Sequence, residues 1–200
     1  MNAPNAVASP LLRALDSLDP GSHLCLIYET QEEQFAALVP FIRRGLDLGQ
    51  HCLHIADDNT AAAVLDALRA GGIPVEGALA SGALAVTTKQ DTYLRHGCFN
   101  PEAMIGYLAE GVEASRRAGF SAARLTGEMT WALGKGPGVH RLLEYESKLN
   151  HFLPHRPALA ICQYNVRRFG PEIIREVLRT HPLVLSPPRS CSSPASRPVR

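Results

Sequence analysis

GSHLCLIYETQEEQ, residues 21–34, is the stretch that decides the fold class of this chain. In it an apolar strand over His23–Tyr28 runs directly into a helix. Nucleotide-binding α/β proteins place a glycine-rich phosphate loop at such a turn, followed by Lys and Ser or Thr at the helix start. Here residues 28–33 read YETQEE, with three carboxylates and neither glycine nor lysine. The stretch therefore predicts either a fold that does not bind nucleotides or a nucleotide-binding fold without its hydrolytic machinery.

Strand-like apolar runs alternate with helical patterns along the rest of the chain. The expected strands cover residues 23–28, 51–56, 83–88, 122–127, 158–165 and 183–185. The expected helices cover residues 35–46, 61–70, 101–119, 139–149 and a segment that Pro171 opens. Pro40 lies inside the first of these helices and should kink it rather than end it. The alternation predicts a three-layer α/β domain, in which a mostly parallel sheet has helices on both faces.

Length, charge and cysteine content exclude several classes of protein. Two hundred residues suit one domain, and a net charge of +1 disfavours a surface dedicated to nucleic acid or membrane. No apolar run approaches the roughly 18 residues of a membrane span, and the N-terminus lacks a signal-peptide pattern. The five cysteines include no CxxC pair, so we expect a reduced, cytoplasmic protein. We expect one domain over residues 21–185, between an N-terminal extension, 1–20, and a disordered Pro/Ser/Arg-rich tail, 186–200.

Glu128 and Trp131 stand at the end of the fourth expected strand, where open parallel sheets bind their ligands. A tryptophan beside a carboxyl group can form an apolar-walled pocket that raises the pKa of the acid. In the alternative interpretation Trp131 only packs, and Glu128 caps the next element. Both interpretations are open from the sequence.

Glu146 falls in the middle of an apolar helix face formed by Val139, Leu142, Leu149 and Leu153. A carboxylate buried there must be paired, hydrogen-bonded or protonated, because leaving it bare would cost several kcal/mol. A structural ion pair with an arginine is the first interpretation, and an acid that faces a ligand is the second.

The fifth expected strand ends in polar groups. Alternation places Cys162 and Tyr164 on one face of this strand, and Gln163 and Asn165 on the other. The two amides suit hydrogen bonding to a neutral ligand or, equally, to a neighbouring loop.

Four side chains on the first two strands have the chemistry of zinc ligands: His23, Cys25, Cys52 and His54. They would form a site only if the two strands were adjacent, and His-x-Cys spacing on a strand is a weak signal. The chain has no GxSxG motif and no cysteine beside a glycine at a strand-to-helix elbow. We therefore expect no metal, no cofactor and no catalytic residue.

A set of motifs spread over some four-fifths of the chain points to one family. They are the His23–Tyr28 strand; Phe41 with Gly45-Leu46; Tyr93 with Gly97, Phe99 and Pro101; Gly127-Glu128-Met129 with Trp131; Glu144-Tyr145-Glu146; Cys162-Gln163-Tyr164; Arg168-Phe169; and His181-Pro182. In combination they resemble the MEDS family, named for methanogens, methylotrophs and the sensory domain of the dichloromethane regulator DcmR.

The resemblance implies a RecA/KaiC-like fold with a degenerate phosphate loop, around which the acids Asp57, Asp58 and Glu128 remain. It also implies a sensor of small organic compounds, often joined to helix-turn-helix, histidine-kinase or other signalling domains. The first twenty residues are too short for a helix-turn-helix, so we expect a signalling partner, a kinase or regulator, with a homodimer also allowed. Asn165 stands where the family is expected to carry Asp, which weighs against a charge-dependent role there.

We predict a non-catalytic, small-molecule-sensing domain that acts in transcriptional or two-component signalling. Its ligand is expected in one shared cavity at the carboxyl ends of the strands. The predicted ligand-binding residues are His23, Tyr28, Tyr93, Glu128, Trp131, Glu146, Cys162 and Tyr164. A nucleotide-binding or hydrolytic enzyme with a replaced phosphate loop is the alternative, and a purely structural protein-interaction module is the third hypothesis.

Overall fold

A six-stranded sheet of order β3-β2-β4-β5-β1-β6 organises residues 10–186, the part of the chain that the computed structural model describes. Every neighbouring pair of strands in it is parallel. The strands are β1 His23–Tyr28, β2 His51–Ala56, β3 Leu84–Thr88, β4 Ala123–Glu128, β5 Ala158–Asn165 and β6 Leu183–Leu185. This confirms the predicted α/β class, and four of the six strands have the expected bounds.

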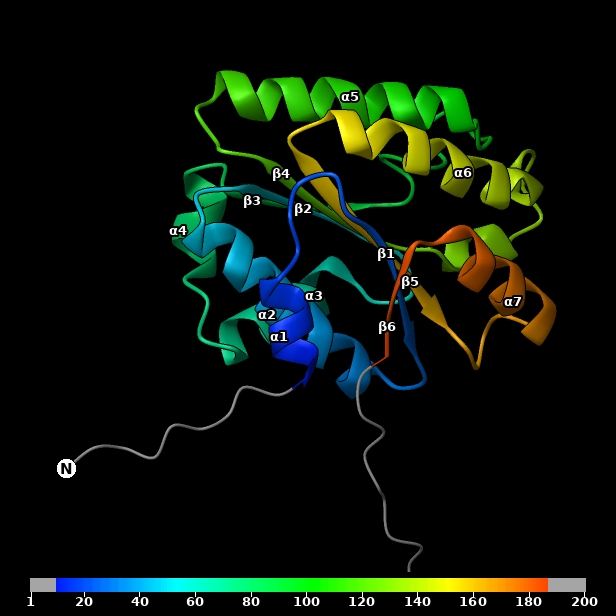
Figure 1. Cartoon of the computed structure of the whole chain (residues 1–200), viewed down its shortest axis with the longest axis horizontal. Helices are drawn as coiled ribbons and strands as arrows, with labels where there is room; N and C mark the ends of the chain where they lie inside the picture. The colour runs from blue at the N-terminus through cyan, green and yellow to red at the C-terminus, as the bar shows by residue number, and fades with distance from the viewer. Residues whose placement is uncertain (1–9, 187–200) are drawn as a thin grey trace, which may run out of the picture.

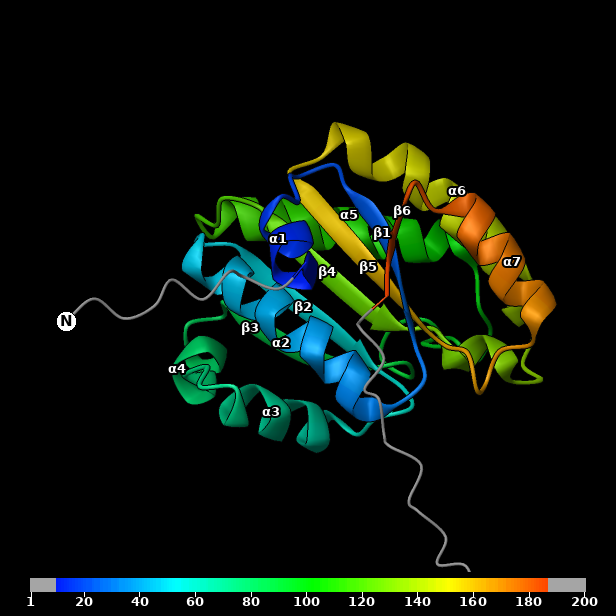
Figure 2. The ribbon, with the colours of Figure 1, turned by 60° about the horizontal axis from the view of Figure 1, so that its bottom comes forward.

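Helices cover both faces of the sheet and make the outer two of three layers (Figure 1). Helices α5 and α6 lie over one face, called here the α6 face, and α7 packs beside α6. Helices α1, α2 and α3 lie over the opposite face, called the α2 face (Figure 2). The helices are α1 Pro10–Asp16, α2 Gln31–Asp47, α3 Ala61–Ala70, α4 Val75–Ala80, α5 Pro101–Arg117, α6 Leu142–Phe152 and α7 Pro171–Thr180. Short 3-10 turns follow at η1 Thr130–Leu133, η2 Val139–Arg141 and η3 Leu153–His155.

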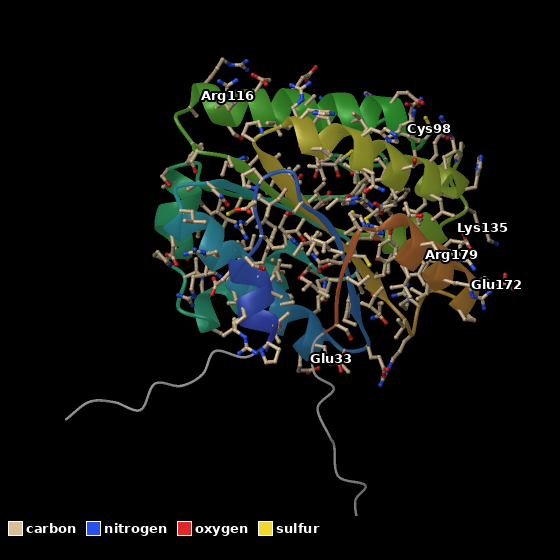
Figure 3. The ribbon with its side chains drawn as sticks, viewed as in Figure 1. Glu33, Cys98, Arg116, Lys135, Glu172 and Arg179 are labelled. Carbon is tan, nitrogen blue, oxygen red and sulfur yellow. The ribbon has the colours of Figure 1, made fainter. Side chains whose placement is uncertain are left out.

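Strand alternation divides the core into two apolar clusters, one on each face of the sheet. Cys25 and Cys162 belong to the cluster under α5 and α6. Leu24, Leu26 and Tyr28 belong to the cluster under α2 and α3. Charged side chains such as Arg116, Lys135 and Glu172 point outward instead (Figure 3). The face on which a strand residue lies therefore decides which candidate site it can join.

Two short helices were not predicted from the sequence. Helix α1 buries Leu11 and Leu15 against the α2 layer, within the stretch expected to be an N-terminal extension. Helix α4 has six residues and no side-chain cap, so it carries little sequence signal. The expected tail, apart from Ser186, lies outside the described residues.

Helix α2 starts and continues as its sequence predicts. Thr30 caps its N-terminus by accepting a hydrogen bond from the backbone N–H of Glu33. Pro40 lies inside the helix and does not end it. Among residues 10–186, no helix has both the length and the apolar character that crossing a membrane requires.

Gly45 lets α2 approach the sheet closely. A methyl group at Gly45 would lie 2.5 Å from Sγ of Cys52 and 2.7 Å from Cδ of Arg124. The Arg124 side chain is fully buried, with its guanidinium 4.5 Å from the ring centre of Phe41 and donating to Oε1 of Gln50 at 2.7 Å. These contacts leave no room for a larger residue at this turn of α2.

We expect Gly45→Ala to lower the free energy of unfolding by about 1–3 kcal/mol, because the added methyl group overpacks this contact. Gly106→Ala is the matched control, since Gly106 lies in α5 with nothing within 4 Å of the added methyl group. There the better helix propensity of alanine should raise stability by about 0.5–1 kcal/mol. Urea unfolding measures the stability of both variants. Equal changes in the free energy of unfolding would contradict the close approach of α2 to the sheet at Gly45.

Candidate functional site

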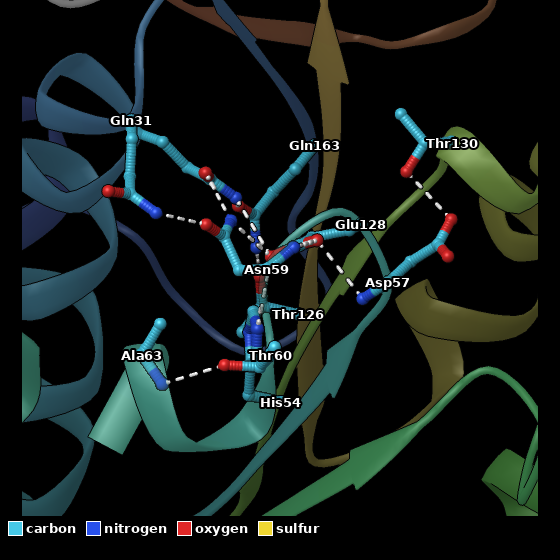
Figure 4. A network of polar contacts seen from close by, with 11 residues as sticks. Gln31, His54, Asp57, Asn59, Thr60, Ala63, Thr126, Glu128, Thr130 and Gln163 are labelled. Atoms are coloured by element: carbon cyan, nitrogen blue, oxygen red, sulfur yellow. Dashed lines mark hydrogen bonds and ion pairs between the residues drawn. The ribbon is translucent and has the colours of Figure 1, made fainter. Parts of the chain in front are cut away.

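Glu128, at the end of β4, is the centre of a buried polar network on the α2 face (Figure 4). Its Oε1 accepts from Nε2 of Gln34 at 3.1 Å and from Nδ2 of Asn59 at 2.8 Å. Its Oε2 accepts from the backbone N–H groups of Asp57 at 3.0 Å and Asn59 at 2.9 Å. Two hydrogen bonds on each oxygen use the acceptor capacity of the carboxylate.

These contacts decide the charge state of Glu128. Burial raises the pKa of its carboxyl group, but His54, 3.6 Å away, and the N–H donors of Asn59 outweigh burial and lower the pKa to about 2. The sequence allowed a raised pKa beside Trp131, and this expectation is wrong. Trp131 belongs to the core on the α6 face, so it forms no wall for this carboxylate.

In the turn between β1 and α2, side-chain oxygens of the protein accept the hydrogen bonds that a bound anion would otherwise accept. The carboxylate of Glu33 accepts from the backbone N–H of Glu29 at 2.7 Å, while Thr30 accepts from the N–H of Glu33 at 3.3 Å. Backbone N–H groups at a helix start are the donors that would hold a phosphate. Here protein oxygens take up these two donors.

The other acids at the carboxyl edge are paired with basic side chains. Asp57 contacts Nζ of Lys89 and accepts from Oγ1 of Thr130 at 2.7 Å. Asp58 contacts the guanidinium of Arg168. The acids that could hold a magnesium ion are therefore engaged within the protein.

A second buried polar group lies on the α6 face, and four elements contribute to it. His23 begins β1, Glu146 lies in α6, Cys162 lies in β5 and His181 follows α7. All four residues are buried. Nε2 of His23 and Nε2 of His181 each lie 3.2 Å from Oε2 of Glu146, and Sγ of Cys162 lies 3.6 Å from Nε2 of His23. We call these four residues the His–Glu–Cys–His cluster.

Outer contacts orient three of the four side chains. Nδ1 of His23 lies 2.7 Å from Oδ1 of Asn150, whose Nδ2 donates to the backbone carbonyl of Thr180 at 2.7 Å. Nδ1 of His181 lies 2.9 Å from the backbone carbonyl of Val177. The hydroxyl of Tyr164 donates to Oε1 of Glu146. The cluster therefore turns three atoms inward: Nε2 of His23, Nε2 of His181 and Oε2 of Glu146.

The protonation states of the cluster are strongly perturbed. Burial raises the pKa of Glu146, but the contacts with His181 and His23 outweigh burial and hold it below its usual range. Burial lowers the pKa of His181, but Glu146 reverses this effect and leaves it raised. Burial and the nearby Glu146 raise the pKa of the Cys162 thiol well above its usual value. In the absence of a metal ion, the cluster therefore holds an ionised Glu146 carboxylate and a protonated Cys162 thiol.

One sequence-based interpretation of Glu146 is corrected, and the condition for a zinc site on the first two strands is not met. Glu146 is buried as predicted, but histidines rather than an arginine face it, because β1 and the end of α7 pack against this side of α6. The zinc set suggested for the first two strands does not form. Strands β5 and β4 lie between β1 and β2, which separates His23 and Cys25 from Cys52 and His54.

A small cavity lies beside the cluster, between the sheet and helices α5 and α6. Its volume is about 20 Å³, and its lining includes Tyr93, Leu108, Tyr145, Leu149 and Cys162. Space of this size holds one water or a molecule little larger. Tyr93 also stacks on Trp131, with ring centres 4.7 Å apart.

The eight predicted ligand-binding residues do not converge on one cavity. Tyr28 and Glu128 lie on the α2 face, because β1 and β4 point them away from α6. The other six lie on the α6 face, where Tyr93 and Trp131 stack and the remaining four form one polar group: His23, Glu146, Cys162 and Tyr164. Their role in ligand binding stays a prediction.

Sequence reasoning missed His181, Asn150 and Tyr145 as members of these sites. His181 and Tyr145 stood within the motifs that carry the family resemblance, which was the one signal available. Asn150 faces His23 only because α6 crosses the start of β1, and no spacing pattern reports such a crossing.

Comparisons with known proteins agree with the fold and add a family. The model of the family described as "MEthanogen/methylotroph, DcmR Sensory domain" (MEDS) matches residues 22–182. The transcriptional repressor DcmR of Methylorubrum extorquens is 31% identical over 160 residues, which cover 80% of this chain and 57% of that protein. This chain thus spans little more than half the length of that curated relative. A KaiC-like protein of Pyrococcus horikoshii is similar in structure, with a TM-score of 0.59, 17% identity, and coverage of 84% of this chain and 72% of that one. The last likeness shows a RecA/KaiC-like fold.

We expect Glu128→Gln to destabilise the protein by about 3 kcal/mol at pH 7. This is the free energy that corresponds to lowering the pKa of the carboxyl group from 4.5 to about 2, and the variant has no carboxylate to contribute it. A lowered pKa gives stability that is fully present above pH 4.5 and is lost as the pH falls toward 2. The difference between wild type and variant should therefore shrink below pH 4.5.

Urea unfolding at pH 7, 5 and 3 measures this difference. Glu110→Gln, at an exposed position of α5, is the control for removal of a negative charge and should have little effect. A Glu128→Gln effect that stays constant from pH 7 to pH 3 would contradict the assignment.

Proposed function

This chain belongs to the MEDS family, and we propose that it is a non-catalytic sensory domain that detects a small organic compound in transcriptional or two-component signalling. The description of the family and the repressor to which this chain is similar both support a sensing role in transcription regulation. In this proposal the output passes to a signalling partner, a kinase or regulator, with a homodimer as one allowed assembly. Such a role belongs in the cytoplasm.

The absence of a reaction is inferred from the state of the carboxyl edge. Glu128 has both oxygens in hydrogen bonds, Asp57 and Asp58 are paired, and the start of α2 is filled by Glu33. A nucleotide and its magnesium ion would have to displace these contacts. This internal saturation is the observation that most favours sensing over the enzyme alternative.

The cavity between the sheet and α5 and α6 is the proposed ligand site. Its lining combines leucine side chains with Tyr93, Tyr145 and Cys162, a mostly apolar set that suits a neutral compound with few atoms. Its volume of about 20 Å³ favours compounds with one carbon atom over larger ligands. Tyr93 joins this site to Trp131, the single tryptophan of the chain.

We expect neither ATP nor GTP with Mg²⁺ to change the thermal unfolding of the full chain. A ligand at a hundred times its dissociation constant stabilises a protein by about 2.7 kcal/mol, an effect that differential scanning fluorimetry detects readily. A reproducible rise in the unfolding temperature with nucleotide and Mg²⁺, but not with Mg²⁺ alone, would favour the nucleotide-binding alternative.

We expect methanol or dichloromethane at low concentration to change the fluorescence of Trp131 in a saturable way, because Tyr93 lies between the cavity and the indole. Ala160→Val is the matched variant, since Ala160 lines the cavity and two extra methyl groups would fill it. Overpacking typically costs about 1–3 kcal/mol, so we expect the variant to fold, and its thermal unfolding is measured first.

Saturation in the wild type and its loss in the folded Ala160→Val variant is the expected result. A linear change that is equal in the two proteins, and in free N-acetyltryptophanamide, is a solvent effect and would argue against this cavity as the ligand site.

A further inference from the structure

The His–Glu–Cys–His cluster has the spacing of a metal site. One ligand atom from each of His23, Glu146, Cys162 and His181 lies within 4.8 Å of each of the others. Zinc binds nitrogen and oxygen at about 2.0–2.2 Å and sulfur at about 2.3 Å in a tetrahedron, so its ligand atoms stand roughly 3.3–3.7 Å apart. Three distances in the cluster, 3.2, 3.2 and 3.6 Å, already lie close to that range. Small side-chain rotations would bring the remaining pairs into it.

The outer contacts fix which nitrogen of each imidazole faces the centre. Asn150 uses its Nδ2 to donate to a carbonyl, so its Oδ1 is the atom that accepts from Nδ1–H of His23. The carbonyl of Val177 can only accept, so His181 also carries a proton on Nδ1. In neutral imidazoles both inward Nε2 atoms then have lone pairs. Metal-bound histidines are held by outer acceptors in the same manner.

Two of the three inward atoms take part in no aligned hydrogen bond, while the third, Nε2 of His23, lies 3.6 Å from Sγ of Cys162. Within the described part of the chain, Oε2 of Glu146 and Nε2 of His181 have no aligned hydrogen bond, although they are 3.2 Å apart and fully buried. A cation held between this carboxylate and this imidazole would give both atoms a partner.

The charge of the cluster matches a divalent ion. When Cys162 loses its thiol proton to solvent, the ligands are one thiolate, one carboxylate and two neutral imidazoles, with a net charge of −2. A zinc ion would make the buried group neutral.

We propose that His23, Glu146, Cys162 and His181 bind one zinc ion in a closed, four-ligand site. Mixed nitrogen, sulfur and oxygen ligands suit zinc better than magnesium or calcium. With every ligand supplied by the protein, the ion acts structurally and joins β1, α6, β5 and the end of α7. The evidence for this site does not depend on the proposed sensing function, because it involves no organic ligand, although Cys162 also lines the proposed ligand cavity.

Metal analysis of the full chain tests this site. After expression with zinc and exhaustive dialysis, inductively coupled plasma mass spectrometry should find about one zinc per chain. Cys162→Ser and His181→Gln should reduce the zinc content at least tenfold. His54→Gln and Cys98→Ser are the matched controls and should keep it, because His54 is buried beside Glu128 and Cys98 is exposed, both outside the cluster.

Asn150→Ala is a gentler variant that removes an outer contact and leaves all four ligands. Loss of such a contact should weaken zinc affinity about 10–100-fold, measured by competition with a chromophoric chelator. Removal of zinc by EDTA should lower the unfolding temperature of the wild type, and added Zn²⁺ should restore it.

Cobalt substitution keeps the proposal testable if the ligand variants do not fold. The wild-type protein with Co²⁺ should show the absorption of a tetrahedral site together with a thiolate-to-metal charge-transfer band. A folded wild type that retains no zinc and gives no cobalt spectrum overturns the proposal. Zinc that persists in folded Cys162→Ser and His181→Gln overturns it as well.

Discussion

Burial of the Glu146 carboxylate is the constraint on which the α6 face depends. This side chain is fully buried in the middle of an apolar helix face, where an unpaired charge would cost several kcal/mol. Its partners come from far along the chain, because His23 begins β1 and His181 follows α7. Helices α6 and α7 and the first strand must therefore pack in one arrangement if the carboxylate is to be satisfied.

Glu128 shows the same constraint met in a different way. It too is fully buried, but amide side chains and backbone N–H groups give each of its oxygens two hydrogen bonds. These donors satisfy both oxygens of the Glu128 carboxylate. The cluster around Glu146 leaves inward lone pairs without aligned partners. These two buried acids, one at the end of β4 and one in α6, thus differ in their surroundings: amide and backbone N–H groups satisfy Glu128, whereas two histidines and a cysteine surround Glu146.

The sequence predicted most of the fold because its signals are local. The apolar runs predicted β1, β2, β5 and β6 with their observed bounds, and the capping residues and glycines predicted the main helices. It also placed Glu146 in a buried stripe, since helical periodicity needs only neighbouring residues. The partners of Glu146 could not be found in this way. Strand order places β5 between β1 and β4, and no local pattern records that order.

The eight residues expected around one cavity lie on two faces of the sheet for a related reason. The rule that ligands bind at the carboxyl ends of strands names an edge of the sheet, but not a face. Alternation then sends Tyr28 and Glu128 to the α2 face and Cys162 and Tyr164 to the α6 face. A prediction that combined the edge with the face of each residue would have separated the two groups.

Cys162 connects the two proposals for the α6 face. It lines the small cavity, and its sulfur also lies 3.6 Å from Nε2 of His23. Helix α6 likewise gives Leu149 to the cavity and Glu146 to the cluster. A compound that moves Cys162 or α6 would therefore change the affinity for zinc, and thermodynamic linkage requires zinc to change the affinity for that compound by the same factor. Since the cluster holds β1 and the end of α7 together, this coupling would carry the presence of a ligand from the buried cavity to the β6 edge of the sheet.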